Sequence, residues 1–448
     1  MKIRRCAAIL AAKVLSFGCK AAGKQGVTMA GKLAMKIDPG ILRDLSSQVR
    51  FQTYMVCGTN GKTTTNNLLA SALEAEGKKV ICNRTGSNML MGVAAAFVLN
   101  ASVTGKIDAD YACIEVDEAS AVRVLPYMKP DYMILTNLFR DQLDRYGEID
   151  ITMDYLEKAM EMVPGMKLIF NGDDSLSAYL AEKSGHSCAA FGISQQVFEQ
   201  KETGEIREGR FCKKCGGRLE YDFYHYSQMG VYHCPSCGFS RPEILFDASD
   251  ISMKDGVSFR VGNDLLKADY RGFYNIYNIL AVYSALSMSG HSPEKLNEVL
   301  KNYNPQNGRN EKFTIRGTKV LLNLAKNPAG FNQNIAAVME DKSRKDIIIV
   351  INDNAQDGKD ISWLWDVDFD AFADSSIHSI TVSGIRAQDM RLRLKYVDIP
   401  AILEGSVEKA IRDRLADGCG NLYVLVNYTA LYSTHNILTS MQKKGGTS

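Results

Sequence analysis

The sequence predicts an α/β protein built on parallel sheets that helices cover on both faces. From Phe51 onward, short apolar runs alternate with stretches of helical periodicity, and the same alternation returns in the last third of the chain. Strands that alternate with helices pair in parallel, because a crossover helix returns the chain to the starting edge of the sheet. A chain of 448 residues exceeds what one core normally holds, so we expect two or three domains.

The first α/β unit is expected at residues 51–311. Its strands are predicted at Thr53–Cys57, Val80–Cys82, Tyr111–Glu115, Tyr132–Thr136 and Lys167–Phe170, its extended segments at 245–261, and its clearest helices at Lys62–Glu76 and Tyr274–Met288. Residues 205–242 are rich in Cys, Gly, Lys and Tyr and interrupt this rhythm. They indicate a module inserted into the unit.

A second α/β unit is expected at 312–448, after a polar stretch at Asn302–Asn310 that has the composition of a linker. Its strands are predicted at Val320–Leu324, Asp346–Ile351, Ser379–Val382 and Leu422–Val426, and its helices at Asn332–Glu340, Ala387–Leu394 and Val407–Leu415. The pattern is typical of a Rossmann-like domain.

The N-terminal segment, residues 1–50, is basic. Its first 36 residues hold eight Lys and Arg and no acidic residue, and Cys6–Cys19 is apolar apart from Lys13. This favours an amphipathic helix that packs on the body of the protein. A helix that also touches anionic lipid, or a cleaved signal, are the alternatives.

Composition excludes some functions and suggests a compartment. A net charge of +2 offers no general attraction for nucleic acid or for a membrane. Of eleven cysteines, four form a metal-binding pattern and seven are scattered, mostly in apolar runs. Scattered thiols of this kind are typical of a reducing, cytoplasmic setting.

A glycine-rich loop predicts a nucleotide site. The stretch Gly58, Thr59, Asn60, Gly61, Lys62, Thr63, Thr64 lies between a predicted strand and a predicted helix. Backbone N–H groups at such a helix N-terminus bind phosphate, the lysine reaches the terminal phosphates, and Thr63 suits Mg²⁺. The longer G-x-x-x-x-G-K-[ST] pattern is not met, because Val56 stands at its first glycine.

Glu115 is the expected second Mg²⁺ ligand, because it ends a predicted strand at the carboxyl edge of the sheet, where ligands bind in open α/β folds. Asp117 and Glu118 follow closely in the chain. We expect them to be solvated or to cap a helix.

The inserted module carries a zinc pattern. Cys212-x₂-Cys215 and Cys234-x₂-Cys237 are separated by eighteen residues, as in four-thiolate ribbons. Four protein ligands leave no open position for water, which favours a structural role over a catalytic one. His225 and His233 are expected to be spectators, and the aromatic residues at 221–226 are either the small core of the ribbon or a contact surface.

Several motifs resemble those of Mur ligases and folylpolyglutamate synthases. The short phosphate loop is one, and the others are Thr136-Asn-Leu-Phe-Arg-Asp-Gln-Leu-Asp144, Asn275-x₂-Asn278-x₂-Ala281 and Gly308-Arg309-Asn310-Glu311. The resemblance implies a Mur ligase-like central domain in which Asn275 and Arg309 approach the nucleotide. Gln142 replaces the usual His, and Lys158 is off the spacing of the lysine that Mur ligases carbamylate, so we carry over no carbamate.

The chain more closely resembles the MurT family, the ligase subunits of lipid II isoglutaminyl synthase. MurT proteins lack the N-terminal UDP-binding domain and carry a Cys₄ ribbon in the central domain. Their C-terminal domain contains stretches similar to two that are found here, Lys326-Asn-Pro-Ala-Gly330 and Asp353-Asn-Ala-Gln-Asp357-Gly-Lys-Asp360-Ile-Ser-Trp-Leu-Trp365. The resemblance implies ATP, Mg²⁺ and structural Zn²⁺, and a D-glutamate carboxylate of lipid II that is activated as an acyl phosphate.

The resemblance also implies a partner. A GatD-type class I glutamine amidotransferase would supply ammonia, and an aspartate of this chain would complete its Cys–His pair. Asp360 is our first choice and Asp353 and Asp357 are the rivals. The resemblance further implies that the substrate lipid would bring the chain to the inner membrane face. There are two alternative functions: a stand-alone Mur-like or folate-type amino acid ligase, and a non-enzymatic RNA-binding ribbon protein.

Overall fold

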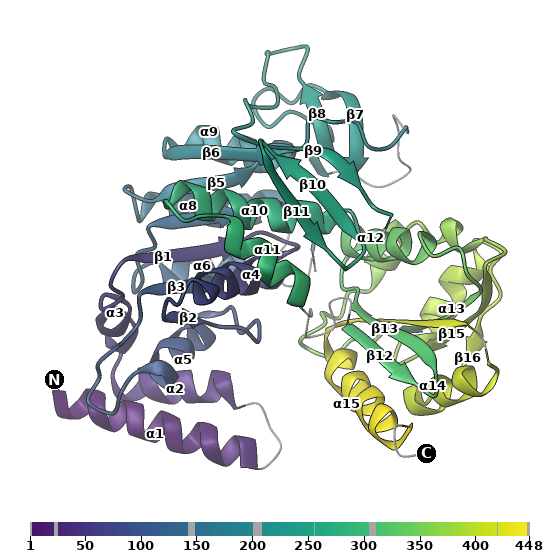
Figure 1. The fold of residues 1–448 in the computed structure, drawn as a ribbon, viewed down its shortest axis with the longest axis horizontal. Helices are drawn as coiled ribbons and strands as arrows, with labels where there is room; N and C mark the ends of the chain where they lie inside the picture. The colour runs from purple at the N-terminus through teal and green to yellow at the C-terminus, as the bar shows by residue number, and fades with distance from the viewer. Residues whose placement is uncertain are drawn as a thin grey trace.

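The computed structural model describes residues 2–21, 26–141, 148–199, 208–254, 256–303, 311–418 and 420–445. Figure 1 shows two α/β bodies side by side, with a helical hairpin at the N-terminus. No helix in these ranges is long and apolar enough to cross a membrane.

The larger body is built on a nine-stranded sheet with the strand order β11-β10-β9-β6-β5-β4-β1-β3-β2. Its strands are β1 (Gln52–Cys57), β2 (Val80–Cys82), β3 (Tyr111–Glu115), β4 (Tyr132–Leu135), β5 (Lys167–Asn171), β6 (Ser187–Gly192), β9 (Phe246–Ser252), β10 (Val257–Val261) and β11 (Asp264–Ala268). The strands from β2 across to β9 pair in parallel, and β10 and β11 add an antiparallel edge.

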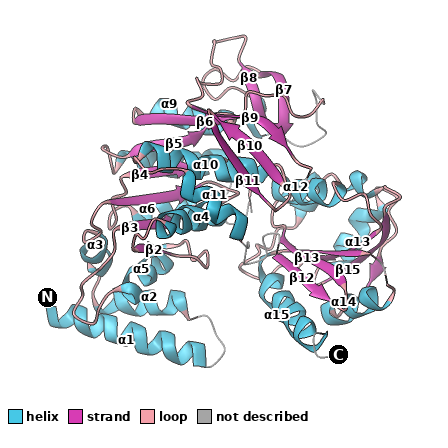
Figure 2. Cartoon of the chain, in the orientation of Figure 1, coloured by secondary structure: helices cyan, strands magenta, loops and turns pink. Residues whose placement is uncertain are grey.

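Helices cover both faces of this sheet (Figure 2). One face is covered by α4 (Lys62–Ala75), α10 (Tyr274–Met288) and α11 (Glu294–Asn302), and the other by α5 (Leu90–Asn100), α6 (Glu118–Val124), α8 (Ile149–Glu161) and α9 (Ser175–Ser184). Strand β1 is buried on both sides, with Tyr54 and Val56 in one core and Met55 and Cys57 in the other. That double burial explains why its sequence is a continuous apolar run.

Three N-terminal helices pack on α5 and extend one core of the larger body outward. They are α1 (Lys2–Ala21), α2 (Val27–Ile37) and α3 (Ile41–Ser46).

The smaller body holds a six-stranded sheet with the order β12-β13-β17-β14-β15-β16. Its strands are β12 (Glu311–Ile315), β13 (Thr318–Leu324), β14 (Lys345–Val350), β15 (Ile377–Ser383), β16 (Ile402–Leu403) and β17 (Asn421–Val426).

Helices also cover both faces of the smaller sheet. The helices are α12 (Pro328–Met339), α13 (Ala387–Lys395), η2 (Ser362–Asp366) and η3 (Phe369–Phe372) on one face, and α14 (Val407–Ala416) and α15 (Tyr428–Gly445) on the other. A separate hairpin, β7 (Glu220–Tyr226) and β8 (Met229–His233), follows the short helix η1 (Glu208–Arg210).

The predicted α/β fold with parallel sheets is confirmed, and most predicted strands agree within two residues. Helix α12 begins at Pro328, four residues before the predicted Asn332, because the Asn327 side chain caps it by accepting from the Gly330 amide at 2.8 Å. Strands β6, β11, β12 and β16 were missed. The small residues of β6, the alternating polar residues of β11 and β12, and the two-residue length of β16 carry little strand signal.

Candidate active site

The glycine-rich loop lies where the strand order changes direction. Strand β1 stands between β3 and β4, and all three point their carboxyl ends toward the loop that joins β1 to α4. Open parallel sheets bind ligands at such an edge. Glu115 at the end of β3 and Thr136 just after β4 are therefore brought beside Gly58.

The loop needs its two glycines for different reasons. Gly58 and Gly61 have φ values of +118° and +85°, which other residues rarely adopt. A Cβ at Gly58 would also overlap Thr136, and one at Gly61 would overlap the side-chain oxygen of Asn278. Gly61 begins α4 without a side-chain cap. The first N–H groups of the helix are thus arranged for an anion.

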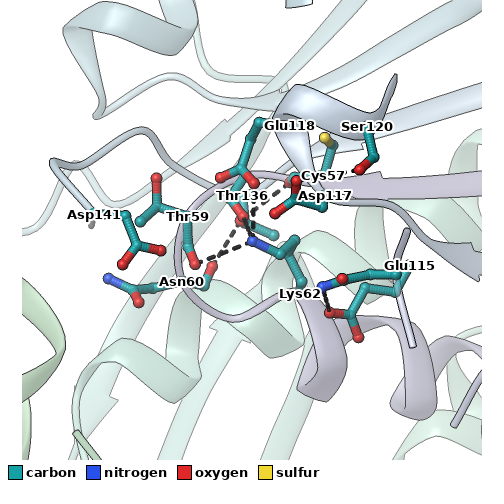
Figure 3. Close-up of polar contacts among 12 residues, drawn as sticks. Cys57, Thr59, Asn60, Lys62, Glu115, Asp117, Glu118, Ser120, Thr136 and Asp141 are labelled. Carbon is teal, nitrogen blue, oxygen red and sulfur yellow. Dashed lines mark hydrogen bonds and ion pairs between the residues drawn. The ribbon is translucent and has the colours of Figure 1, made fainter. Parts of the chain in front are cut away.

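The Thr136–Asn137 pair clamps the loop from the side. Thr136 Oγ1 donates to the Asn60 carbonyl at 2.7 Å, and Asn137 Oδ1 accepts from the Asn60 amide at 2.9 Å. The Thr59 amide donates to the Asn137 carbonyl at 2.8 Å. This part of the Mur-like T-N-L motif therefore holds the shape of the loop, and Thr136 lies beside Thr59 and Asn60 in Figure 3.

Lys62 is buried and paired with a carboxylate. Its Nζ lies 3.1 Å from Glu118 Oε2 and also donates to the carbonyls of Gly58 and Thr59 (Figure 3). Burial disfavours the ammonium, but the carboxylates of Glu118, Asp117 and Glu115 outweigh burial and raise the pKa of Lys62. Lys62 is therefore a fixed positive charge at the mouth of the loop.

The expectation that Asp117 and Glu118 are solvated was wrong, whereas Asp117 does stand at the N-cap position of α6, without a side-chain hydrogen bond to the helix backbone. Both are buried, and Glu118 lies in the first turn of α6, facing Lys62. Burial raises the pKa of Glu118, and the Lys62 ammonium opposes that rise. The sequence contained no cue for this, because the pairing depends on how α6 is placed against the loop.

Thr63 and Glu115 converge as a pair of oxygen ligands. Thr63 Oγ1 donates to Glu115 Oε2 at 2.6 Å, and Asn88 Nδ2 orients the other carboxylate oxygen at 2.8 Å. Adjacent ligands on an octahedral Mg²⁺ stand about 2.9 Å apart, given metal–oxygen bonds of about 2.1 Å. The two oxygens fit Mg²⁺ with a small adjustment.

The two asparagines of the N-x-x-N segment have different positions. Asn278 touches Gly61. Asn275 instead donates to the Arg271 carbonyl at 2.7 Å and accepts from Asn278 Nδ2 at 3.2 Å. Arg309 and Gln142 lie outside the described residues. Lys158 lies in the last turn of α8.

The smaller body reaches the loop through the Lys326–Asn327 pair. Asn327 Nδ2 donates to Asn60 Oδ1 at 3.1 Å, and Lys326 Nζ lies 2.5 Å from Asp141 Oδ2. The predicted Lys326–Gly330 motif therefore meets the phosphate loop directly. A small cavity opens beside this contact and is lined by Thr59, Glu118, Phe139, Arg140, Asp141, Ile149 and Thr152.

The three candidate aspartates occupy distinct environments. Asp353 pairs with Arg386 at 3.0 Å. Asp357 is buried and accepts from the Thr429 amide at 2.8 Å at the start of α15. Asp360 is half-buried and accepts from the Ser362 amide at 2.8 Å. It lines a surface pocket together with Lys359, Ile361, Ser362, Leu364, Trp365, Asp389 and Leu392.

A buried arginine holds the segment that follows Asp360. Arg393 donates to the carbonyls of Leu364 and Val367 at 3.1 and 2.8 Å, and its guanidinium lies 5.5 Å from the Trp365 ring centre. Helix η2 is fixed by these bonds, so the pocket at Asp360 has a rigid wall.

The four cysteines of the module come together as the spacing predicts. Their ligand atoms all lie within 4.8 Å of one another, with Sγ–Sγ distances of 3.6 Å for Cys212–Cys237 and 3.5 Å for Cys215–Cys234. Four sulfurs at about 2.3 Å from a tetrahedral zinc stand about 3.8 Å apart, so the arrangement fits that ion. The left-handed glycines Gly216 and Gly238 close the two turns.

His225 and His233 are outside this cluster. His225 is buried and makes a 3.0 Å hydrogen bond with the Ile193 carbonyl, and burial lowers its pKa. The aromatic residues divide between two sites. Tyr221 stacks on Tyr224 within the hairpin, with ring centres 4.1 Å apart, whereas Tyr226 packs against Phe273 of the main core.

One residue that the sequence analysis missed connects the module to the phosphate loop. Gln228, fully buried in the turn of the hairpin, donates to the Leu138 carbonyl and to Asp174 Oδ1, both at 2.7 Å. Asp174 in turn accepts from the Leu138 amide at 2.8 Å. Leu138 follows the Thr136–Asn137 clamp, so the hairpin supports the clamp from behind. A single glutamine in a turn offers no sequence signal for such a role.

The chain is similar to Mur ligases in both sequence and fold. Residues 56–233 match the Mur ligase middle domain. The fold is similar to a pseudomurein peptide ligase type C from Methanothermus fervidus, with 21% identity, coverage of 88% of this chain and 79% of that one, and a TM-score of 0.69. MurF from Acinetobacter baumannii is similar at 13% identity, with coverage of 92% and 80% and a TM-score of 0.66. The fold and the loop define a Mur-type, ATP-dependent, amide-forming ligase.

The particular family follows from closer relatives. Residues 324–431 match the MurT ligase C-terminal domain. The lipid II isoglutaminyl synthase (glutamine-hydrolyzing) subunit MurT of Staphylococcus aureus (strain COL) is 36% identical, with coverage of 96% of both chains. Its namesake in Streptococcus pneumoniae is 31% identical, with coverage of 99% of this chain and 98% of the relative. The chain belongs to the MurT family.

The Gln228 connection gives a testable prediction. Gln228→Ala would remove the side-chain donor to the Leu138 carbonyl, one of the donors to Asp174 and the acceptor of the Gly209 amide, so we expect a loss of about 2–3 kcal/mol of unfolding free energy. Urea unfolding measures it. The matched control is Gln196→Ala, at an exposed glutamine, which should change stability by less than about 0.5 kcal/mol. Equal stability of the two variants would contradict the supporting role.

Proposed function

We propose that the chain is the ligase subunit of a glutamine-hydrolysing lipid II isoglutaminyl synthase. The observation that carries the proposal is full-length similarity to MurT subunits, together with an intact phosphate loop. The substrate would be the D-glutamate carboxylate of the lipid II stem peptide, and the product a D-isoglutamine amide. Its place of action would be the cytoplasm, at the inner face of the membrane that holds the lipid.

ATP would bind at Gly58–Thr64, with Asn275 and Arg309 as further contacts. The uncapped N-terminus of α4 and the buried Lys62 ammonium supply positive potential for the phosphates. Thr63 and Glu115 would hold Mg²⁺, which supplies charge neutralisation at the phosphates when bound. Because Lys62 is paired with Glu118, phosphate oxygens must replace that carboxylate as its partner.

The reaction proceeds in two transfers. The substrate carboxylate attacks the γ-phosphorus, the bond to the β-phosphate oxygen breaks, and ADP leaves with an acyl phosphate formed. Ammonia then attacks the acyl carbon, the carbon–oxygen bond to phosphate breaks, and a proton from nitrogen passes to solvent. The carboxylate needs this activation because it is a poor electrophile, and Lys62 stabilises the charge on the transferred group.

A partner subunit would deliver the ammonia. We propose a GatD-type class I glutamine amidotransferase, with Asp360 completing its Cys–His pair by orienting the imidazole. Asp360 is favoured over its rivals because Asp353 is engaged by Arg386 and Asp357 caps α15. Exposed apolar side chains lie at this site and suit a subunit contact: Trp365 and Leu392 line the pocket, and Tyr396 packs against Trp365.

The Cys₄ module would bind one zinc ion and act structurally, since four thiolates close the coordination shell. We propose that the chain divides into an N-terminal segment 1–50, a central ATP-binding domain 51–311 with the module at 205–242, and a C-terminal domain 312–448. A stand-alone amino acid ligase, the alternative, would work without a partner and accept an amino acid in place of ammonia.

The ATP assignment is tested by Lys62→Ala. We expect amidation to fall about 100-fold or more, because the fixed charge that faces the transferred phosphoryl group is lost. The assay is ADP release and lipid II amidation, with circular dichroism to show that the fold persists. Lys267→Ala, at an exposed lysine, is the control and should retain full activity. Normal amidation by Lys62→Ala would refute the assignment.

The partner site is tested by Asp360→Asn. We expect glutamine-driven amidation to fall by about two orders of magnitude or more, because the neutral amide no longer stabilises an imidazolium. Amidation fed by ammonium salts should be unchanged, since it bypasses glutamine hydrolysis. Asp353→Asn is the matched comparison and should support both reactions. Equal loss of both activities in Asp360→Asn would place Asp360 in the ligase step instead.

Zinc is tested by elemental analysis of the purified chain, with one zinc per chain expected. Cys215→Ser should lose the ion and lower the melting temperature, because metal binding stabilises the folded module. Cys188→Ser, at an exposed thiol away from the cluster, should leave both unchanged. A folded wild-type chain that contains no metal would disprove the ribbon.

A further inference from the structure

Helix α1 presents an apolar stripe that none of the described residues covers. Ile3, Leu10, Val14 and Phe17 recur at helical spacing, and their side chains are 87%, 52%, 63% and 77% exposed. Ile3 and Phe17 are the two most exposed large apolar residues in the described part of the chain. Water-exposed apolar side chains aligned on one helix face indicate a surface that meets something else.

The opposite face of α1 fixes its orientation. Ala8, Ile9 and Ala12 are fully buried in the core of the larger body. Arg5 forms ion pairs with Asp38 and Asp44, and Lys13 donates to the Leu99 carbonyl at 2.9 Å. The stripe therefore cannot turn inward without losing this packing. Figure 1 shows α1 at the outer edge of the body, beyond α2.

The charge around the stripe is of one sign. Residues 1–36 hold eight Lys and Arg and no acid. Lys20 on α1 and Lys32 and Lys36 on α2 are exposed, so the hairpin presents cationic side chains to solvent. An apolar stripe on a helix with cationic neighbours is the pattern of a helix that lies in an anionic lipid interface.

We propose that this face of α1 docks the chain on an anionic membrane surface, with the helix parallel to the bilayer. From Ile3 to Phe17 the stripe extends over about 21 Å, at about 1.5 Å per residue. A second copy of the chain is disfavoured as the occupant, because a symmetric contact would bring two basic segments together. The inference rests on the proposed function in one respect: a lipid-linked substrate gives the docking its purpose.

Vesicle co-sedimentation of the full chain tests the proposal. We expect wild type to bind vesicles of phosphatidylglycerol and phosphatidylcholine, and to bind less as salt rises or when phosphatidylglycerol is omitted. The double variant Val14→Glu/Phe17→Glu should lower the partition coefficient about tenfold or more, since two apolar contacts are replaced by charges that anionic lipid repels. Leu245→Glu/Leu265→Glu, at two exposed leucines elsewhere, is the matched control and should bind as wild type.

Activity measurements separate this proposal from the proposed function. With ammonium as nitrogen source, the Val14→Glu/Phe17→Glu variant should be impaired on lipid II in vesicles and normal on a water-soluble analogue without the lipid tail. Wild-type chain that ignores anionic vesicles, a double variant that still binds them, or equal loss on both substrates would overturn the docking. A wild-type dimer that the double variant dissociates would also overturn it, in favour of a self-contact. If wild type binds vesicles but amidates neither substrate, the docking stands and the proposed function fails.

Discussion

The candidate active site depends on one constraint: the backbone of a short glycine-rich loop must make two left-handed turns that leave no room for side chains. Gly58 and Gly61 give the loop its left-handed turns, and a side chain at either position would collide with Thr136 or Asn278. Hydrogen bonds from Thr136 and Asn137 fix the loop from one side. The N-terminus of α4 has no side-chain cap, so its first backbone amides and its dipole can bind an anion.

The buried charge beside the loop has a consequence for ligand binding. Burial disfavours the charged form of Lys62, and the carboxylate of Glu118 compensates this at 3.1 Å. In the proposed ATP site, a bound nucleotide would exchange one anionic partner of the lysine for another, so the ammonium would not lose its compensation. Without a ligand, the ion pair with Glu118 favours the charged form of Lys62.

Two other parts of the chain reach the loop from a distance. The smaller body contacts the loop through Asn327 and pairs with Asp141 beside it through Lys326. The module that holds the four cysteines supports the Thr136–Asn137 clamp through Gln228. Asp360 lies instead on the rim of a separate pocket of the smaller body. The proposed phosphate chemistry and the proposed contact with a nitrogen-delivering partner would therefore lie at two separate places, and the smaller body takes part in both.

The sequence by itself determined the α/β class, the phosphate loop and the cysteine quartet, because periodicity and short spacings are local properties of the chain. It also marked Lys326–Gly330 as significant without indicating what those residues touch. Only the tertiary structure decided that Glu118 is the partner of Lys62, that Asn278 lies nearer the loop than Asn275, and that Gln228 braces the clamp. Each of these depends on residues tens of positions apart, whose meeting is set by the packing of helices and loops on the sheet.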